Sequence, residues 1–379
     1  LSFQLLLLIA VIGTCFCDSL PIIVAANDSD VFLLSGRWNA IEAGVQADWP
    51  CATVKFGFEV SDPAVAAVSL LWSGLRVNVN VTIWNEDGTI FSSQLVKNLL
   101  IDRPAPPAEV LLQFSKTGRY AVTLRKLTCA ASYGMGVGAK LLEESWFSFH
   151  GVSAFSGGSL IHVEETGTPR HRRVEVIGGS DPQGYCVDGT EAANDGIGIY
   201  LSGFQYDNCD LAYSGLLASR LDAELYLEAI AGIGLTQNAG ASHPIEMGKL
   251  PMPALFNRTT QMSPSPVWNF SAWAPDLIII DLGGNDYNHQ GGDAPSNRTF
   301  NTAMEDFLMQ LFGSYYPPQR EQGQGLAQGV QIVLACGMGD PTEASYDPDN
   351  NRCRPCPHVE DAATSFQRKH PSLRSSVHY

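Results

Sequence analysis

Residues 173–181 have the sequence RVEVIGGSD, and the rest of the chain is interpreted outward from them. Val174, Val176 and Ile177 are β-formers, and the two glycines that follow allow backbone conformations closed to larger residues. The stretch predicts a short buried strand and a tight turn. The turn would present the Ser180 hydroxyl above a sheet edge, beside backbone N–H groups that could bind an oxyanion. Hydrolases display a nucleophile in this way, although an ordinary Gly-Ser turn has the same sequence.

The composition is that of a globular protein. The chain has 379 residues. This is too long for a single hydrophobic core of ordinary size, so the length predicts two domains. Hydrophobic residues make up 45% and charged residues 16%, which excludes a disordered chain. Asp and Glu number 39 against 23 Lys and Arg, so the formal net charge is -16. Such a surface repels a phosphate backbone, and we expect no nucleic-acid partner.

The first residues predict export. An apolar run from Leu5 to Ile12 is too short to span a bilayer comfortably, and small residues follow it. Residues 1–18 are therefore interpreted as a secretory signal peptide cleaved near Cys17 or Ser19, with a buried first strand as the alternative. The missing initial Met indicates a fragment at this end. No later run is long enough for a membrane span. N-glycosylation sequons, which agree with a secreted, extracellular glycoprotein, begin at Asn27, Asn80, Asn257, Asn269 and Asn297.

The chain has 9 cysteines. Cys15 and Cys17 would leave with the signal peptide, and the others would meet an oxidising compartment in which disulfides are the default. The connectivity is open. Plausible pairs are Cys51–Cys129, Cys186–Cys209 and Cys353–Cys356, with Cys336 left over. The last pair also has the spacing of half a zinc site, but no second such pair accompanies it, so we expect no metal.

Residues 19–166 predict an antiparallel β-sandwich. Apolar and polar residues alternate in several runs, as in half-buried strands, and turn residues separate the runs. Hardly any helical period interrupts them, which is typical of a sandwich. The strand-like runs are 54–60, 76–83, 109–114 and 120–124, and the turns are 85–88, 116–118 and 155–158.

Residues 167–379 have a different pattern and predict an α/β domain. A basic run at 167–173 marks the boundary, interpreted as a solvated linker with an anion-binding patch as the alternative. Strands alternating with helices imply a parallel sheet covered on both faces, whose active site lies beyond the carboxyl ends of its strands. The expected strands are 223–231, 275–282, 329–335 and 375–379, and the expected helices are 210–221, 302–312 and 358–369.

Three of these strands end in small or polar residues that would meet at one sheet edge. Ser180 offers a hydroxyl, Gly232 a backbone N–H, and Asn285 a side-chain amide. These are the parts of an oxyanion hole built from separate loops. Each position taken alone is equally consistent with a turn or a helix cap. Their order along the chain favours the functional interpretation.

The order Gly-x-Ser, Gly, Gly-x-Asn-Asp resembles the SGNH (GDSL-type) serine hydrolases. Residues 251–259 and 268–286 narrow the resemblance to family-2 carbohydrate esterases, which also place a β-sandwich before the hydrolase domain. The resemblance covers nearly the whole mature chain. It implies a jelly-roll-like sandwich followed by a flavodoxin-like hydrolase domain. It also implies a secreted serine esterase that removes O-acetyl groups from a polysaccharide such as xylan or mannan by acyl-serine chemistry, with no metal or other cofactor.

By this resemblance Ser180 is the nucleophile, and its N–H, the Gly232 N–H and the Asn285 amide form the oxyanion hole. Trp268 and Trp273 would bind the faces of sugar rings, although core packing explains both equally well. Gly179 departs from the family, which usually has Asp there, and this puts the presentation of Ser180 in doubt.

The catalytic base is the second departure. The family carries its histidine in an Asp-x-His-Pro stretch, and His370-Pro371 is similar, but Arg368 occupies the Asp position and the stretch comes at the last helix. We therefore interpret the chain as truncated ahead of its base. His370 is kept as the alternative, because some members use backbone carbonyls in place of the Asp. His289 is expected to be a loop residue.

Two further functions stay open. A non-catalytic glycan-binding protein on an esterase scaffold would explain Gly179 and the missing base. A lipid-directed GDSL esterase is disfavoured by the leading β-domain. For the first two functions the expected partner is an acetylated polysaccharide or oligosaccharide. The sequence decides neither which one nor the oligomeric state.

Overall fold

The structure is a computed structural model. It describes residues 22–26, 28–75, 77–98, 108–129, 145–162, 172–189, 206–239, 250–287, 294–316, 330–336 and 355–379. Residues 1–18, expected to be a signal peptide, and Asn27, His289 and Cys353 lie outside these ranges. The helices of the described ranges include none that combines the length and the apolar character needed to cross a membrane.

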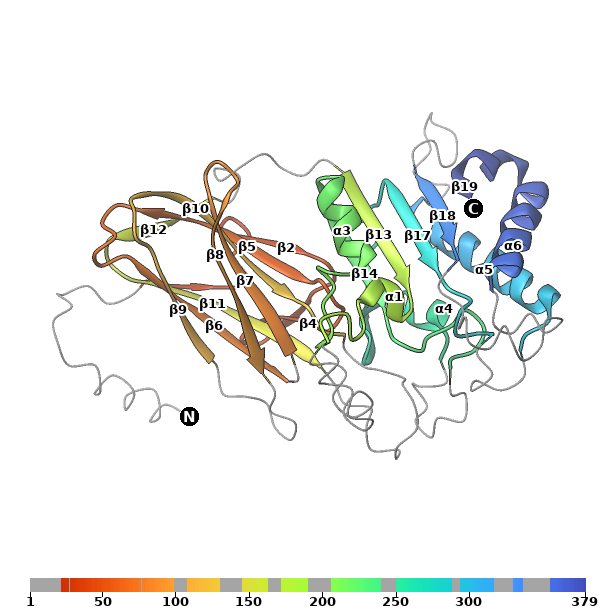
Figure 1. Cartoon of the computed structure of the whole chain (residues 1–379), viewed down its shortest axis with the longest axis horizontal. Coiled ribbons are helices and arrows are strands. Elements are labelled where there is room, and N and C mark those ends of the chain that lie inside the picture. The colour runs from red at the N-terminus through yellow and green to blue at the C-terminus, as the bar shows by residue number, and fades with distance from the viewer. Residues whose placement is uncertain are drawn as a thin grey trace.

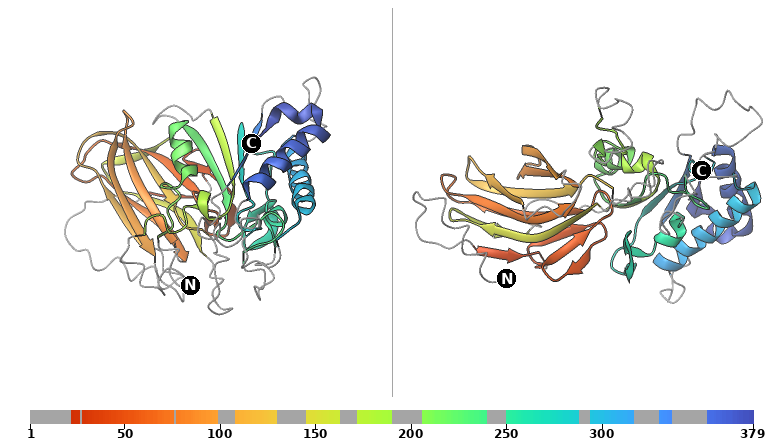
Figure 2. Two further views of the ribbon diagram at one scale, coloured as in Figure 1. Left: turned by 45° about the vertical axis from the view of Figure 1, so that its right-hand side comes forward. Right: turned by 90° about the horizontal axis from the view of Figure 1, so that it is seen from below.

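Two antiparallel sheets packed face to face form the first half of the chain (Figures 1 and 2). One has the order β3-β4-β11-β6-β9 with β1 on β11, and the other β12-β5-β10-β7-β8 with β2 on β5. The strands are β1 (Ile22–Ala25), β2 (Phe32–Ser35), β3 (Asn39–Ile41), β4 (Gly44–Ala47), β5 (Thr53–Val60), β6 (Ala67–Leu75), β7 (Val77–Asn85), β8 (Ile90–Asn98), β9 (Ala108–Gln113), β10 (Gly118–Lys126), β11 (Trp146–Ala154) and β12 (Gly158–Ile161).

The alternation expected for this half is present. In β5, Val54, Phe56 and Phe58 are fully buried in the core between the sheets, whereas Lys55 and Glu59 are half-exposed. Aromatic rings fill that core, such as Phe32 edge-on to Phe56 at 5.8 Å between ring centroids. The predicted β-sandwich is confirmed.

A parallel sheet of order β14-β13-β17-β18-β19 forms the second half. Its strands are β13 (Arg172–Gly178), β14 (Ala223–Ala229), β17 (Leu277–Asp281), β18 (Gln331–Ala335) and β19 (Val377–His378), and β15 (Arg258–Thr260) pairs with β16 (Ser263–Val267) beside it. The helices are α1 (Ser180–Gln183), α3 (Tyr213–Arg220), α4 (Met252–Leu255), α5 (Asn297–Tyr315) and α6 (Cys356–Lys369), followed by the 3-10 turn η9 (Pro371–Ser376).

Helices cover both faces of this sheet. Ile177, Ile278 and Ile280 pack in one core with apolar residues of α5 and α6, whereas Val176 and Leu227 pack in another with Ala218 of α3. The predicted α/β architecture with a parallel sheet is therefore confirmed. The domain limits 19–166 and 167–379 stay predictions, because the residues at the boundary lie outside the described ranges.

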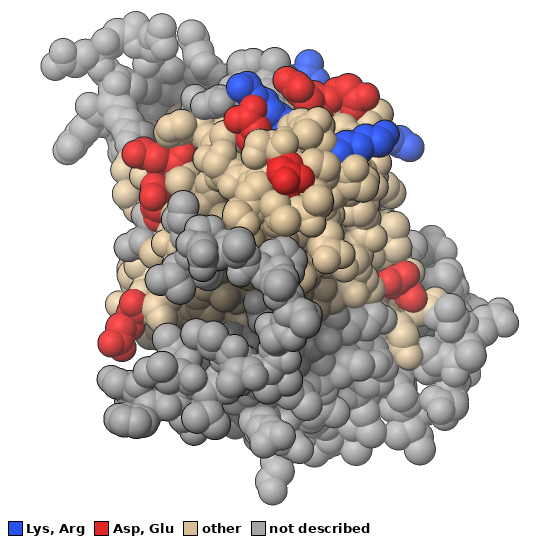
Figure 3. All heavy atoms as spheres, turned by 90° about the vertical axis from the view of Figure 1, so that its left-hand side faces the viewer, with Lys and Arg blue, Asp and Glu red and all other residues tan. Residues whose placement is uncertain are grey.

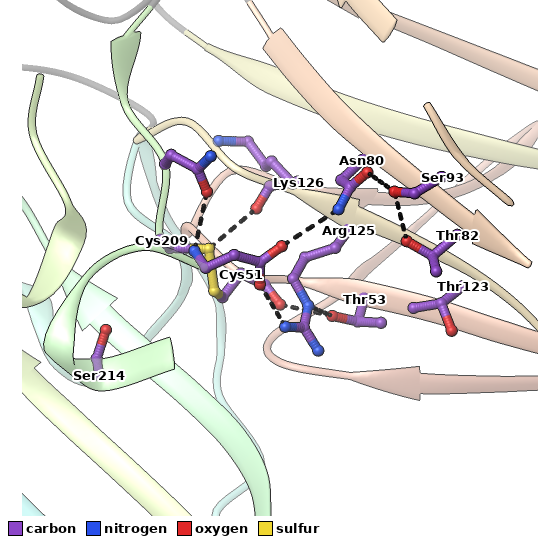
Figure 4. A network of polar contacts seen from close by, with 12 residues as sticks. Cys51, Thr53, Asn80, Thr82, Ser93, Thr123, Arg125, Lys126, Cys209 and Ser214 are labelled. Atoms are coloured by element: carbon purple, nitrogen blue, oxygen red, sulfur yellow. Dashed lines mark hydrogen bonds and ion pairs between the residues drawn. A yellow bond between two sulfur atoms is a disulfide. The ribbon is translucent and has the colours of Figure 1, made fainter. Parts of the chain in front are cut away.

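A disulfide joins the two halves. Cys51 of the sandwich pairs with Cys209 of the α/β domain, with 6.0 Å between their Cα atoms and 158 residues between them in sequence. Beside it, Arg125 of β10 contacts Asp210 at 2.5 Å, and Asn80 of β7 donates to the same carboxylate at 3.4 Å (Figure 4). The junction is thus covalent and polar.

The expected cysteine pairs are corrected. Cys51–Cys129 and Cys186–Cys209 are wrong, because Cys51 and Cys209 bond to each other. Cys353–Cys356 is wrong as well, since Cys356 pairs with Cys336. Cys51 and Cys209 lie in loops of the two halves, and Cys336 follows β18 where Cys356 begins α6. The spacing of cysteines in the sequence does not indicate such contacts.

Candidate active site

The serine turn follows β13 at the carboxyl edge of the sheet. A Cβ atom on Gly178 would lie 2.7 Å from both the Asp281 carbonyl oxygen and Pro182 Cγ, so this position has no room for a side chain. The chain then passes Gly179 and begins α1 at Ser180, which is half-buried. The short helix ends at Gly184, whose φ of 76° is left-handed.

The structure brings the three predicted loops into contact. The Asn285 amide nitrogen donates to the Ile233 carbonyl at 2.7 Å, and Ile233 directly follows Gly232. A Cβ atom on Gly179 would lie 2.9 Å from the same nitrogen, so the Asn285 side chain lies against the residue that precedes Ser180. The contacts run from the serine turn through Asn285 to the Gly232 loop.

Among the described residues, the Asn285 amide nitrogen has one hydrogen-bond acceptor. A carboxamide has two N–H donors, and the Ile233 carbonyl takes one. Gly232 has a φ of 85°, a left-handed conformation that favours glycine. The arrangement could offer donors from two loops to a developing negative charge.

Gly179 lies against the Asn285 side chain. A Cβ atom on Gly179 would lie 2.9 Å from the Asn285 amide nitrogen, so one of the two would have to shift.

Asp286 fixes the Asn285 loop to the Gly232 loop, a role that the sequence analysis missed. Its buried carboxylate accepts N–H bonds from Leu235 at 2.8 Å and Thr236 at 2.6 Å, and the Thr236 hydroxyl at 2.6 Å. Burial raises the pKa of Asp286, and these hydrogen bonds oppose that rise. The Asp of Gly-x-Asn-Asp therefore links the Asn285 loop to the Gly232 loop through hydrogen bonds.

Asp281 lies beside the serine turn as the last residue of β17, paired with Gly178. Its carboxylate accepts a hydrogen bond from the Tyr213 hydroxyl at 2.9 Å. Burial raises the pKa of Asp281 to about 6, and Asp181 adds to the rise. The sequence analysis did not single it out, because the residue ends an apolar strand.

His370 lies at the opposite end of the sheet from Ser180. α6 begins at Cys356, which is bonded to Cys336 just after β18. The helix runs back to the amino end of the strands, where β19 pairs with Ile332. His370 Nε2 is 2.9 Å from Glu305 Oε1 of α5. This placement contradicts His370 as the base for Ser180, because the helix carries it away from the carboxyl edge.

His358 lies in the first turn of α6, at the carboxyl edge of the parallel sheet. Its ring stacks on Tyr287 at 4.3 Å, and its Nδ1 is 3.2 Å from Asn297 Oδ1. Its buried Nε2 has no hydrogen-bond partner among the described residues. Burial lowers the pKa of His358, so the ring is neutral at pH 7. No histidine of the described ranges is hydrogen-bonded to the Ser180 hydroxyl.

Trp268 and Trp273 pack at the domain junction. Trp273 is 7% exposed, stacks on Tyr226 at 3.7 Å and donates its indole N–H to Glu224 at 2.8 Å. Trp268 lies over the Arg37 guanidinium at 5.6 Å. The expected sugar-stacking role is therefore wrong for Trp273, which is buried, and the contacts of Trp268 are those of interdomain packing.

Among the described residues, the one group of potential metal ligands consists of Cys51, Cys209 and Asp210. The two sulfur atoms are joined in the disulfide, so these residues cannot hold an ion in this state.

Sequence comparisons find two related enzymes, and no family model matches the chain. The chain is 26% identical over 269 residues to the cellulase/esterase CelE of Acetivibrio thermocellus and 26% identical over 141 residues to an acetylxylan esterase/glucomannan deacetylase of Cellvibrio japonicus. The matches cover 68% and 37% of this chain, but only 29% and 36% of those proteins.

Solved structures share the fold. A family-two carbohydrate esterase from Cellvibrio japonicus has a TM-score of 0.68 at 18% identity, over 95% of this chain and 88% of that one. One from Clostridium thermocellum, in complex with cellohexaose, has a TM-score of 0.66 at 20% identity, over 92% and 87%. In sequence and in fold, the chain is similar to the family-2 carbohydrate esterases.

Proposed function

We propose that the chain is a secreted serine esterase that removes O-acetyl groups from polysaccharides such as xylan or mannan. The observation that carries the proposal is the contact chain from Gly179 through Asn285 to Ile233, which holds a hydroxyl, an amide and a glycine loop at one sheet edge. The curated relatives, named cellulase/esterase and acetylxylan esterase/glucomannan deacetylase, support the esterase class and the substrate. The sequons and disulfides support an extracellular location.

In the proposed reaction the Ser180 oxygen attacks the acetyl carbonyl carbon. The second Asn285 amide N–H and the backbone N–H groups of Ser180 and Gly232 stabilise the oxyanion. The carbon–oxygen bond to the sugar breaks, the sugar hydroxyl leaves with a proton, and an acetyl-serine remains. Water then releases acetate and restores the serine.

The serine proton needs an acceptor. His370 is excluded by its place in the fold, and His358 has the neutral ring and unpartnered Nε2 of a base but is not bonded to Ser180. We therefore expect a low rate, of the kind that an oxyanion hole supports without a complete triad.

The test is acetate release from acetylated xylan and acetylated glucomannan. Ser180→Ala should abolish the release, and Asn285→Ala should lower it by roughly a hundredfold. His370→Ala should leave the rate unchanged, whereas a loss in His358→Ala alone would assign the base. Acetate release that survives Ser180→Ala would refute the proposal. Polysaccharide binding without Ser180-dependent release would instead indicate a non-catalytic glycan-binding protein.

A further inference from the structure

We propose that the outer face of the β12-β5-β10-β7-β8 sheet is a second carbohydrate-binding site, centred on Trp84, for a neutral polysaccharide. On β7, Val79, Val81 and Ile83 point into the core, so Thr82 and Trp84 point outward. The site is thus on the sandwich, away from the strand ends that carry Ser180.

The Trp84 side chain reaches toward the neighbouring strand β10. By register, Ala121 of β10 is its direct partner, and Gly57 of β5 follows Ala121 in the same row. The indole N–H of Trp84 donates to the Thr123 hydroxyl of β10 at 3.2 Å. The ring therefore reaches from β7 over Ala121, whose side chain is only 4% exposed although it points outward. Small residues beneath the ring make the platform.

The Trp84 side chain is half-buried and points away from the core between the sheets. The C–H face of a sugar ring stacks on such a surface, since aromatic side chains combine a large apolar area with a rigid shape. The opposite neighbour, Ile90, is 57% exposed and extends the apolar strip. The row of four strands is about 14 Å wide, given a strand spacing of about 4.8 Å.

Hydrogen-bonding groups border the strip on one side. Ser93 is exposed there, and its hydroxyl lies 3.2 Å from that of the buried Thr82 (Figure 4). Thr123 belongs to the same row as Thr82 and is half-buried. Hydroxyl groups of this kind can exchange hydrogen bonds with the hydroxyls of a sugar chain.

The charges nearby are balanced, which favours a neutral ligand over an anionic one. Arg119 pairs with Glu59 at 3.3 Å on this sheet, and Arg125 pairs with Asp210. Figure 3 draws the end of the sandwich rather than this face; there basic side chains lie near acidic ones along the top, and the other charged side chains in view are acidic. No electrostatic field of one sign would select a polyanion.

The site also has a place in the proposed reaction. Arg125 and Asp210 tie this sheet to the segment before α3. A second binding site for the polysaccharide would raise the local concentration of acetyl groups near Ser180 and leave the catalytic step unchanged.

The test measures binding of cellohexaose and deacetylated glucomannan by titration calorimetry, in the Ser180→Ala protein so that no turnover occurs. Trp84→Ala should weaken the affinity by roughly tenfold or more. The matched control is Trp146→Ala, because Trp146 is half-buried on the outer side of the other sheet and should not matter. Equal affinities in Trp84→Ala and its parent, equal losses in both variants, or no binding by the parent would overturn the proposal.

Two measurements keep the result separate from folding and from catalysis. If Trp84→Ala melts early, Trp84→Phe serves instead, and the emission change that cellohexaose causes in the parent should be reduced in it. In chains with Ser180, Trp84→Ala should hydrolyse 4-nitrophenyl acetate as fast as the parent does and act more slowly on the polymer. Failure of the esterase proposal would leave the binding result standing.

Discussion

Replacing Arg37 by Met should destabilise both domains, because this one side chain connects them. Arg37 follows β2 of the sandwich and is fully buried in the α/β domain. Its guanidinium is 3.2 Å from Glu175 on β13 and 2.9 Å from Glu228 on β14, the latter without hydrogen-bond geometry. It also donates to the Phe256 carbonyl, and to the Arg258 carbonyl at 3.0 Å.

The magnitude follows from what the variant leaves behind. Met fills much of the volume but leaves Glu175 and Glu228 buried on neighbouring strands without the guanidinium, while the Tyr315 hydroxyl still donates to Glu175 at 2.6 Å. Removing one partner of a buried ion pair costs about 3–5 kcal/mol, and the two lost carbonyl bonds add about 1 kcal/mol each. We expect a loss of about 5–7 kcal/mol, a large fraction of the stability of an ordinary domain.

The assay is urea unfolding followed by tryptophan fluorescence. Arg119→Met is the control, because Arg119 and Glu59 are 41% and 44% exposed and such pairs contribute at most about 1 kcal/mol. Burial raises the pKa of Glu228 and Arg37 opposes that rise, so the pKa rises further without Arg37 and the loss in Arg37→Met should be larger at high pH than at low pH. Adding Glu228→Gln should recover part of it. A loss below about 1 kcal/mol, or no recovery, would refute the reasoning.

Three further changes test other parts of the structure. Gly179→Ala should lower Ser180-dependent acetate release by roughly tenfold to a hundredfold while the melting temperature changes little, because the new Cβ would lie 2.9 Å from the Asn285 amide; an unchanged rate would contradict this. Cys51→Ser with Cys209→Ser opens a link across 158 residues and should lower the melting temperature, with about 5 kcal/mol as the upper limit, and an unchanged calorimetric trace would count against the junction. Burial raises the pKa of Asp281 to about 6. The folded protein therefore loses stability as the pH rises from about 4 to above 6, because the buried carboxyl must then give up its proton. Asp281→Asn should therefore gain up to roughly 3 kcal/mol at pH 8 and nothing at pH 4, and an equal gain at both values would disprove the cause.

Local patterns were enough to predict the layers of the fold. The alternation in β5 and β7 places every second residue in the sandwich core, and the apolar run of β17 marks a strand buried on both faces. Both signals depend only on the repeat of the backbone, which is why they appear in one sequence. The gathering of strand ends at one edge follows from parallel strands alone.

Contacts between distant residues were decided by the tertiary structure. The direction of α6 carries His370 to the amino end of the sheet, the domain junction buries Trp273, and the path after β18 pairs Cys336 with Cys356. The fit of Asn285 against Gly179 belongs to the same group. Such contacts depend on how helices and domains pack against one another. Local sequence patterns do not determine that packing, because it involves residues far apart in the chain.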